Sequence, residues 1–277
     1  MGDCRYCQRP AGLMKSYHAE CKQLHDQATD NIAAAIERSW TEDRVANALP
    51  KLISKFASDG RVGESIVHQT ALTAMSRLAN HALADRLLTG EEEHRLMRLA
   101  ADTGITPADL QNAGIAEPLA KAAVLRDLDS GVFKSRVTLE DAPIILGKNE
   151  SVLWAFTGST LMEYKTTSRT VGRSQGVSIR IMRGVYYRVG AFKGNRISET
   201  TLETTDLGTC VLTSANWYFW GPRRQVRTPL KSILSVQGYA DGIEIAPTAS
   251  TTRPKVFKLA DPEFAASALT RAASLAR

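Results

Sequence analysis

The sequence predicts an α+β protein in three parts: a short cysteine-bearing segment, a helical bundle, and an antiparallel β-barrel or sandwich closed by a C-terminal helix. Three cysteines and a histidine lie within the first 21 residues. Apolar residues then recur at spacings of three and four to about Leu128, and after Gly131 β-branched and aromatic residues alternate with polar ones. We therefore expect domains at residues 1–27, 28–130 and 135–277.

The N-terminal segment has the spacing of a metal site, Cys4-x2-Cys7-x10-His18-x2-Cys21. Zinc takes four ligands in a tetrahedron, and a Cys-x2-Cys turn with a second pair on a helical turn can supply them. The alternative is three unpaired thiols beside a surface histidine, and His25 is a possible replacement ligand. Four protein ligands leave no position for water, so we expect structural zinc without which the segment is unfolded.

The helical part carries several start and stop signals. Thr41 is the expected N-cap of a helix through Phe56, in which Pro50 predicts a kink or break before a turn at 58–60. A long helix should follow over residues 66–83. Thr89 and Glu92 form the pattern of a capping box, which opens a helix that ends near Gly104, and Thr106-Pro107 starts another.

The C-terminal part predicts short antiparallel strands between glycine turns. Residues 172–176 are interpreted as a flexible hairpin tip, Arg183-Gly184 as a tight link, and Asp241-Gly242 as a two-residue hairpin closed through positive φ angles. Asp261-Pro262 predicts the start of one final amphipathic helix. The expected strands are Val152–Tyr164, Val177–Met182, Val185–Phe192, Ile197–Thr205, Thr209–Leu212, Trp217–Trp220, Gln225–Thr228, Leu234–Tyr239, Ile243–Ile245 and Val256–Leu259.

Composition and charge limit the class of protein. The 43% of hydrophobic residues is typical of a chain that forms a core, and no apolar run or N-terminal leader predicts a membrane span or secretion. Clustered cysteines suit a metal in a reducing compartment, so we expect a cytoplasmic location, with Cys210 as a core residue. Residues 1–130 hold 15 Lys and Arg against 18 Asp and Glu, whereas 131–277 hold 20 against 11.

Recognisable catalytic signatures are absent from the sequence, which lacks a Gly-x-Ser-x-Gly elbow, a phosphate-binding loop and a dinucleotide fingerprint. The acids at 91–93 beside His94 are explained by the dipole at a helix start. His68 and His81 have no zinc-protease spacing. We therefore predict that the protein is not an enzyme.

The basic C-terminal half offers a candidate anion-binding rim, because arginine forks suit phosphate groups. A solvated polar face of alternating strands explains the same residues without a ligand, and Trp217, Phe219 and Trp220 are expected in the core rather than as a stacking platform. The candidate anion-binding residues are Arg180, Arg183, Arg188, Arg223, Arg224 and Arg227.

Three segments resemble known families. The N-terminus resembles zinc-ribbon or treble-clef-type knuckles at all four ligand positions. Residues 57–60 and 88–93, ASDG and LTGEEE, are similar to tellurite-resistance-type helical domains. Residues 186–194, 205–213 and 218–221, YYRVGAFKG, TDLGTCVLT and YFWG, resemble uncharacterised bacterial domains of pleckstrin-homology or GRAM type, over about half of the chain. These families imply binding, scaffolding or membrane-proximal sensing.

Two functions follow as expectations. The first is a bacterial or phage-encoded zinc-containing adaptor or sensor that binds a protein partner or an anionic lipid headgroup through its pleckstrin-homology-like domain. The second is a nucleic-acid-binding regulator that uses the knuckle and the basic β-domain surface. An enzyme with an unrecognised site is a third reading.

Overall fold

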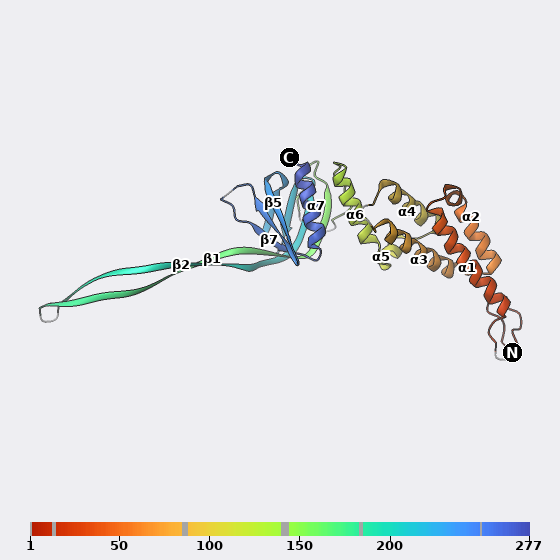
Figure 1. The fold of residues 1–277 in the computed structure, drawn as a ribbon, viewed down its shortest axis with the longest axis horizontal. Helices are drawn as coiled ribbons and strands as arrows, with labels where there is room; N and C mark the ends of the chain where they lie inside the picture. The colour runs from red at the N-terminus through yellow and green to blue at the C-terminus, as the bar shows by residue number, and fades with distance from the viewer. Residues whose placement is uncertain (1, 13–14, 85–87, 140–143, 183–184, 250) are drawn as a thin grey trace. The chain divides into compact units, whose positions relative to one another are not determined.

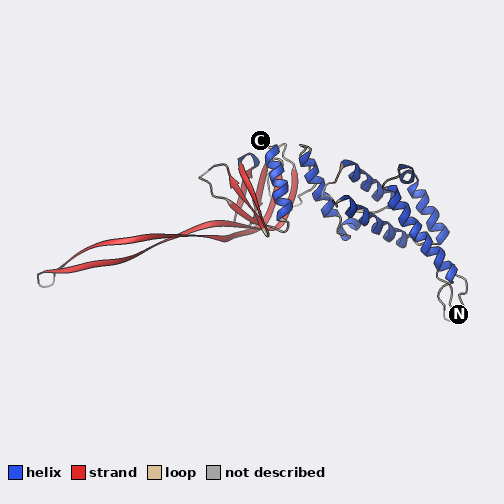
Figure 2. Ribbon diagram, viewed as in Figure 1, coloured by secondary structure: helices blue, strands red, loops and turns tan. Residues whose placement is uncertain are grey.

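The computed structural model describes every residue except 1, 13–14, 85–87, 140–143, 183–184 and 250, and the side chains of 168–199 are not described. The chain divides into two compact units, Met1–Val132 and Phe133–Arg277. The first is helical and the second is a sheet with one long helix, so the protein is of the α+β class (Figure 2).

The helical unit contains α1 to α6, whose bounds are Ala19–Ser39, Asp43–Gly60, Glu64–Ala82, Gly90–Thr103, Pro107–Asn112 and Ala116–Asp129. Its core is built from apolar residues at helical spacing, among them Ile32 and Ile36 of α1, Leu49 of α2 and Met75 of α3, all nearly inaccessible to solvent. Because α1 is continuous from Ala19, the expected limit between residues 27 and 28 lies inside one helix.

Three helix signals are confirmed. Thr89 and Glu92 form the predicted capping box of α4, which ends at Gly104 in the left-handed region with φ 70°. Thr106 caps α5 in the same way, with Asp109 as the reciprocal partner and Pro107 at the first turn. Asp261 accepts a hydrogen bond from the backbone N–H of Phe264 at the start of α7, Pro262–Leu275.

The predicted start of α2 is wrong. Its N-cap is Glu42, without a side-chain capping bond, because the Thr41 hydroxyl instead donates to the carbonyl of Arg38 at the end of α1. Of the kink or break predicted at Pro50, the break does not occur, because the helix continues through Pro50 to Gly60. Residues 58–60, which were expected to form a turn, belong to the same helix. The turn that follows is made by Arg61, which adopts the left-handed conformation.

The second unit is one antiparallel sheet with the strand order β4-β3-β2-β1-β7-β6-β5. Strands β4 and β5 form the edges, so the sheet is open (Figure 1). The bounds of β1 to β7 are Val152–Met182, Val185–Thr213, Asn216–Trp220, Gln225–Pro229, Ile233–Tyr239, Gly242–Pro247 and Lys255–Lys258, with a short 3-10 helix η1 at Leu230–Ser232.

Two long strands, β1 with 31 residues and β2 with 29, form one hairpin where the sequence analysis predicted five short strands. The predicted hairpin tip at residues 172–176 is wrong, because Gly172 is paired with Gly194 and Gly176 with Gly190 inside the ladder. The true hairpin link follows Met182, which pairs with Val185, and the two residues predicted to make it, Arg183-Gly184, lie outside the described residues.

The β5–β6 hairpin is confirmed, but its loop is Ala240-Asp241. Gly242 pairs with Tyr239, and neither Asp241 nor Gly242 has a positive φ. Gly242 is required for another reason: a β-carbon there would overlap the carbonyl oxygen of Phe257 in β7. The position of the hairpin was thus predicted correctly, but the positive φ angles predicted for its loop were wrong.

Aromatic residues form the core of the second unit. The Trp217 ring lies 5.6 Å from Phe156 and 5.7 Å from Phe257, measured between centroids, and Trp217 and Phe219 are fully buried as predicted. Helix α7 covers this core through Phe264, whose ring lies 5.0 Å from Trp154. Its buried face continues through Ala268, Leu269 and Ala272.

Candidate metal centre

A tight loop places the first two cysteines. The N–H of Gln8 donates to the carbonyl of Cys4 at 2.7 Å, and the N–H of Cys4 donates to the carbonyl of Arg9 at 2.8 Å. Gln8 has φ 58°, a conformation that non-glycine residues rarely adopt, and Asp3 is bridged to Pro10. The loop thereby closes on itself between Asp3 and Pro10 and holds Cys4 and Cys7 together.

Helix α1 places the other two residues. His18 is its N-cap and Cys21 lies in its first turn, where residues three apart share a face. The N–H of His18 also points to the sulfur of Cys4 at 3.4 Å. The loop and the helix start therefore meet at one point, in agreement with the predicted spacing.

The four ligand atoms, one from each of Cys4, Cys7, His18 and Cys21, all lie within 4.8 Å of one another. The Nδ1 atom of His18 is 3.4 Å from the sulfur of Cys7 and 3.8 Å from that of Cys21. Zinc bonds of about 2.3 Å to sulfur and 2.0 Å to nitrogen place tetrahedral ligands roughly 3.5–3.8 Å apart. The cluster therefore has the size of a metal site.

The Nε2 atom of His18 has a contact that determines which nitrogen of the ring can bind a metal. Nε2 lies 3.0 Å from the carbonyl oxygen of Pro10, which can only accept, so Nε2 carries the proton. Nδ1 is then left with a free lone pair directed at the cysteines. A second contact that sets the tautomer of a ligating histidine is a regular feature of metal sites.

The thiols of the cluster influence one another's protonation. Burial raises the pKa of Cys4, but hydrogen bonds from the backbone of His18, Cys7 and Tyr6 outweigh it and lower the pKa to about 6. Burial and the neighbouring sulfurs of Cys7 and Cys4 raise the pKa of Cys21. Three thiolates this close repel, and a divalent cation is the natural compensation.

His25, the possible replacement ligand, is not part of the cluster. Its ring packs against Tyr6 at 4.6 Å between centroids, and its Nδ1 lies 3.7 Å from an Asp26 oxygen, beyond hydrogen-bond distance. That nitrogen is buried and has no hydrogen-bond partner among the described residues. Cys210 is fully buried in β2, where burial raises its pKa to about 12, which confirms it as a core residue.

The predicted anion-binding arginines do not gather at one place. Arg180 and Arg188 lie on the distal part of the β1–β2 hairpin, paired with Tyr186 and Ser178, and Arg183 lies outside the described residues. Arg223 and Arg224 lie in the β3–β4 loop and Arg227 in β4. The register makes Arg180 and Arg188 diagonal neighbours on the hairpin, and Arg223, Arg224 and Arg227 form a separate group at β3 and β4.

The β3–β4 loop already holds a carboxylate. The backbone N–H groups of Arg223 and Arg224 donate to Asp206 at 2.8 and 2.7 Å. Burial raises the pKa of Asp206, but these bonds outweigh it and lower the pKa. The Nε–H of Arg227 donates to the Oδ1 atom of Asn216 at 2.9 Å, so one of the guanidinium donors is already engaged within the protein.

Two polar residues that the sequence did not single out organise this unit. Glu150 accepts hydrogen bonds from Gly147, Thr213, Asn216 and Tyr218. Asp206 anchors the loop just described. Asp206 lies in the segment 205–213 quoted above only for its resemblance, and the partners of Glu150 include Tyr218, 68 residues away, so local spacing did not indicate their structural roles.

Comparison of the chain with protein-family models, with curated proteins and with solved structures finds no match. No helix in the described part of the chain combines the length and apolarity needed to cross a bilayer. The features that can indicate a function are therefore the geometry of the cluster, which lies in the first unit, and the architecture of the two units.

Proposed function

We propose that the protein is a non-enzymatic adaptor whose N-terminal segment is folded by one structural zinc ion. The observation that carries this proposal is the closed set of Cys4, Cys7, His18 and Cys21. Four protein ligands fill a tetrahedral shell and leave no position for a reacting water. Reduced thiols of this kind also favour a cytoplasmic location.

Zinc would supply the order that this segment lacks. Residues 2–18 contribute almost no apolar core, since only Cys4 and Ala11 among the described residues there are buried. Metal binding to such short elements contributes on the order of 10 kcal/mol of apparent folding free energy. The metal would also fix the first turn of α1, which carries Cys21.

We propose further that the second unit is a pleckstrin-homology-like domain. Two antiparallel meanders, β1 to β4 and β5 to β7, are joined where β1 pairs with β7, and one helix that follows them covers the core, which supports this. The engagement of Asp206 and Glu150 in structural hydrogen bonds supports contact rather than chemistry as its task. Its partner would be a protein segment or an anionic headgroup.

Amide hydrogen exchange on the full chain tests the structural role of zinc. With zinc bound, the amides of Cys4, Gln8 and Lys22 should be protected, because each donates within the loop or the first turn of α1. A chelator should expose these amides and leave those of α7 protected as an internal control. Equal exchange with and without the chelator would refute the proposal.

Phosphoinositide-containing vesicles test the headgroup version. Binding by the full chain should weaken when Arg223 and Arg224 are both replaced by glutamine, and a variant with Lys51 and Lys55 replaced should bind normally, since both are exposed residues of the other unit. Absence of binding at low salt would leave a protein segment as the proposed partner.

A second candidate function, nucleic-acid binding, is favoured by the β1–β2 hairpin. Only residues 160–163 of β1 pair with β7 and only 209–212 of β2 with β3, so the remaining ladder has no third strand among the described residues. An isolated two-stranded hairpin is marginally stable in water. Within 164–182 and 185–198 the sequence has seven Lys and Arg and no Asp or Glu.

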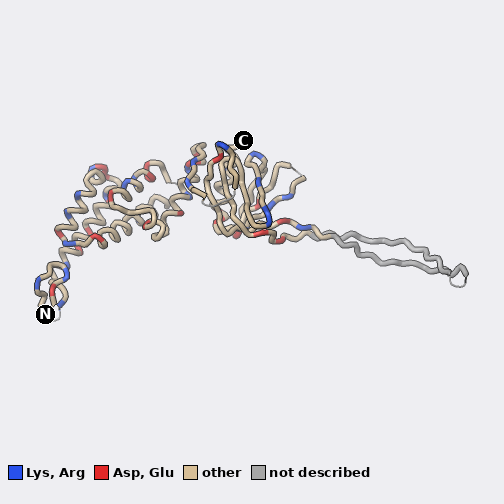
Figure 3. Tube along the Cα trace, turned by 180° about the vertical axis from the view of Figure 1, so that it is seen from behind, with Lys and Arg blue, Asp and Glu red and all other residues tan. Residues whose placement is uncertain are grey.

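A cationic ribbon of this kind fits a nucleic acid better than a bilayer. The major groove of B-DNA admits a two-stranded β-ribbon, and free backbone N–H groups at its edges can reach phosphate oxygens. Open strand edges are not tolerated in the hydrocarbon region of a membrane. Figure 3 shows both charge signs interspersed along the helical unit, whereas the charged residues in the sequence of the ribbon segment are all positive.

Shortening the hairpin tests this second function. Thr166 and Thr200 are paired, with their hydroxyl oxygens 3.0 Å apart, so an Asn-Gly turn inserted between them should close the hairpin while leaving the sheet intact. Affinity for duplex DNA should fall steeply with salt in the natural chain, with a slope of roughly −0.9 per phosphate contact, and should be lost in the short variant. Equal affinity of the two chains would exclude this function.

A further inference from the structure

An open groove of about 670 Å³ lies beside the metal cluster. The lining comes from the loop of residues 2–18, which we call the knuckle, from the first turns of α1 and from the end of α2, and it includes the cluster residues Cys7, His18 and Cys21. Its volume is in the range of pockets that bind small molecules or a few residues of a peptide. A groove built by three separate segments exists only when the knuckle is folded against the helices.

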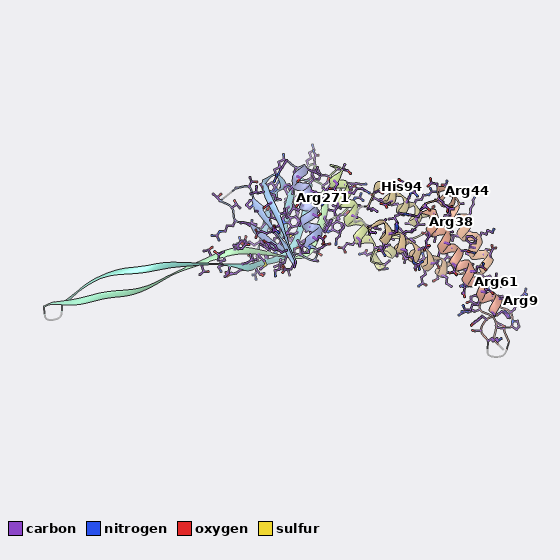
Figure 4. The ribbon with its side chains drawn as sticks, in the orientation of Figure 1. Arg9, Arg38, Arg44, Arg61, His94 and Arg271 are labelled. Carbon is purple, nitrogen blue, oxygen red and sulfur yellow. The ribbon has the colours of Figure 1, made fainter. Side chains whose placement is uncertain are left out.

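Three cations line this groove: Arg9 and Lys15 from the knuckle and Arg61 from the end of α2. None of their charged groups has a hydrogen bond or ion pair among the described residues. Several other cations of the helical unit are paired, for example Arg38 with Glu42 at 2.9 Å and Arg95 with Glu91 at 2.7 Å, whereas exposed cations such as Arg44 have no partner among the described residues, so what distinguishes Arg9, Lys15 and Arg61 is that all three line one groove. Figure 4 shows Arg9 and Arg61 at the end of the unit that holds the cluster.

The backbone of Arg61 adds an independent observation. Its φ of 53° and ψ of 42° place it in the left-handed region at the C-cap of α2, where glycine is the usual residue. The glycine of this turn is Gly60, the last residue of α2, and not the C-cap residue. Glycine is needed at position 60 because a β-carbon there would overlap that of Ala28 in α1. An arginine in an unfavourable backbone conformation in the lining of a groove suggests a functional role for its side chain.

The charge of the metal site does not account for all three cations. Zinc with three thiolates carries a net charge of about −1, and Glu20 on the groove wall adds another negative charge. Three cations exceed these two negative charges. An anionic partner would complete the balance.

The groove also offers apolar surface to its occupant. Leu24 is 56% exposed and Tyr17 is 37% exposed, although both are large hydrophobic residues. The ring of Tyr17 is already covered by the Arg5 guanidinium, which lies 5.3 Å from the ring centroid. This contact occupies one face of the ring, and Tyr17 is the only Phe, Tyr or Trp among the described residues that line the groove. Single-stranded nucleic acids stack successive bases on several aromatic rings, so the lining favours a peptide.

We propose that this groove binds an acidic peptide segment of a partner protein, with carboxylates on Arg9, Lys15 and Arg61 and an apolar side chain on Leu24. The proposal depends on the zinc-folded knuckle proposed above, because that loop carries two of the three cations. It gives the adaptor function a defined contact surface in the first unit. Charge complementarity and exposed apolar surface together select this class of partner.

The test begins with a random-peptide display library, selected on the zinc-loaded full chain under reducing conditions. The selected peptides should be enriched in Asp and Glu flanking a large apolar residue. A fluorescent copy of the consensus should bind about tenfold more weakly to Arg9→Gln and to Arg61→Gly, since each removes one charge-assisted contact. Arg44→Gln, an exposed arginine of α2, is the matched control and should bind normally.

Arg61→Gly separates binding from folding. Glycine relieves the left-handed conformation, so this variant should unfold at a higher temperature than the natural chain while its peptide affinity falls. Arg61→Lys should keep most of the affinity. Selection without acidic enrichment, or equal binding by Arg9→Gln and Arg61→Gly, would overturn the proposal.

The zinc content of each sample, measured by elemental analysis, distinguishes the two levels of failure. A natural chain without zinc would refute the proposed function, whereas a zinc-loaded chain that selects no acidic peptide would refute the groove proposal alone. Loss of zinc from Arg9→Gln or Arg61→Gly would show that these arginines only neutralise the thiolates. This result too would overturn the groove proposal. Capture of single-stranded RNA through the same residues would replace the peptide by a different partner and refute the assignment.

Discussion

Replacing Gly60 by alanine should destabilise the helical unit, although alanine is the better helix former. A β-carbon built on Gly60 overlaps that of Ala28 and lies 3.1 Å from the carbonyl oxygen of Leu24, both in α1. Neither atom can move away by changing a rotamer. Glycine is therefore the residue that allows α1 and α2 to approach each other at this point.

The magnitude follows from two opposing terms. Alanine at a helical position gains about 1 kcal/mol over glycine through propensity. Overpacking a rigid contact costs roughly 3 kcal/mol, at the upper end of the usual range, because the obstacle is a β-carbon and a backbone atom. We expect Gly60→Ala to lower the free energy of unfolding by about 2 kcal/mol.

Urea unfolding of the zinc-loaded chain measures this change, and a double-mutant cycle assigns it. Ala28→Gly removes the overlapping β-carbon, so adding it to Gly60→Ala should restore part of the lost stability, with a favourable coupling of at least about 1 kcal/mol. Gly90→Ala is the control, because nothing lies within 4 Å of a β-carbon there, and it should be neutral or stabilising. A neutral Gly60→Ala, or a double variant no more stable than the sum of the singles, would refute the reasoning.

Two further predictions concern polar groups. Thr89→Ala should cost about 1 kcal/mol of stability by urea unfolding, because the backbone N–H of Glu92 loses its acceptor at 3.2 Å; no change would mean that the capping box is energetically idle. Burial raises the pKa of Glu150, but hydrogen bonds from Asn216, Thr213, Gly147 and Tyr218 outweigh it and lower the pKa. Its contribution to stability is therefore complete above the ordinary carboxyl pKa of about 4.3 and is lost as pH falls through the lower folded value. Glu150→Gln should cost about 1–2 kcal/mol at neutral pH and flatten the acid limb of the stability curve below about pH 4; an unchanged acid limb would contradict the assignment.

Local signals in this sequence predicted local structure well. The capping residues Thr89, Thr106 and Asp261 were identified because a cap and its partner lie within three residues of each other. The metal cluster was found for a related reason: its spacing places each pair of ligands on one turn. A cap or a ligand pair can be predicted from the sequence when all of its residues lie within one short segment.

Non-local structure escaped the same reasoning. Alternating residues with glycines between them are compatible with several short strands or two long ones, and only the pairing of Gly172 with Gly194 decides. Thr41 was misassigned because its hydroxyl found an acceptor in the preceding helix. The left-handed Arg61 could not be foreseen, because the glycine expected there is required one position earlier by Ala28.

The central claim is that one zinc ion occupies the shell of Cys4, Cys7, His18 and Cys21. Elemental analysis of the full chain, purified under reducing conditions without added metal, tests it most directly. We predict about one zinc per chain, retained in Cys210→Ala because that thiol is buried far along the sequence in β2, and lost in Cys4→Ser and Cys21→Ser. A natural chain that contains no stoichiometric metal, or one whose zinc persists in both serine variants, would contradict the account.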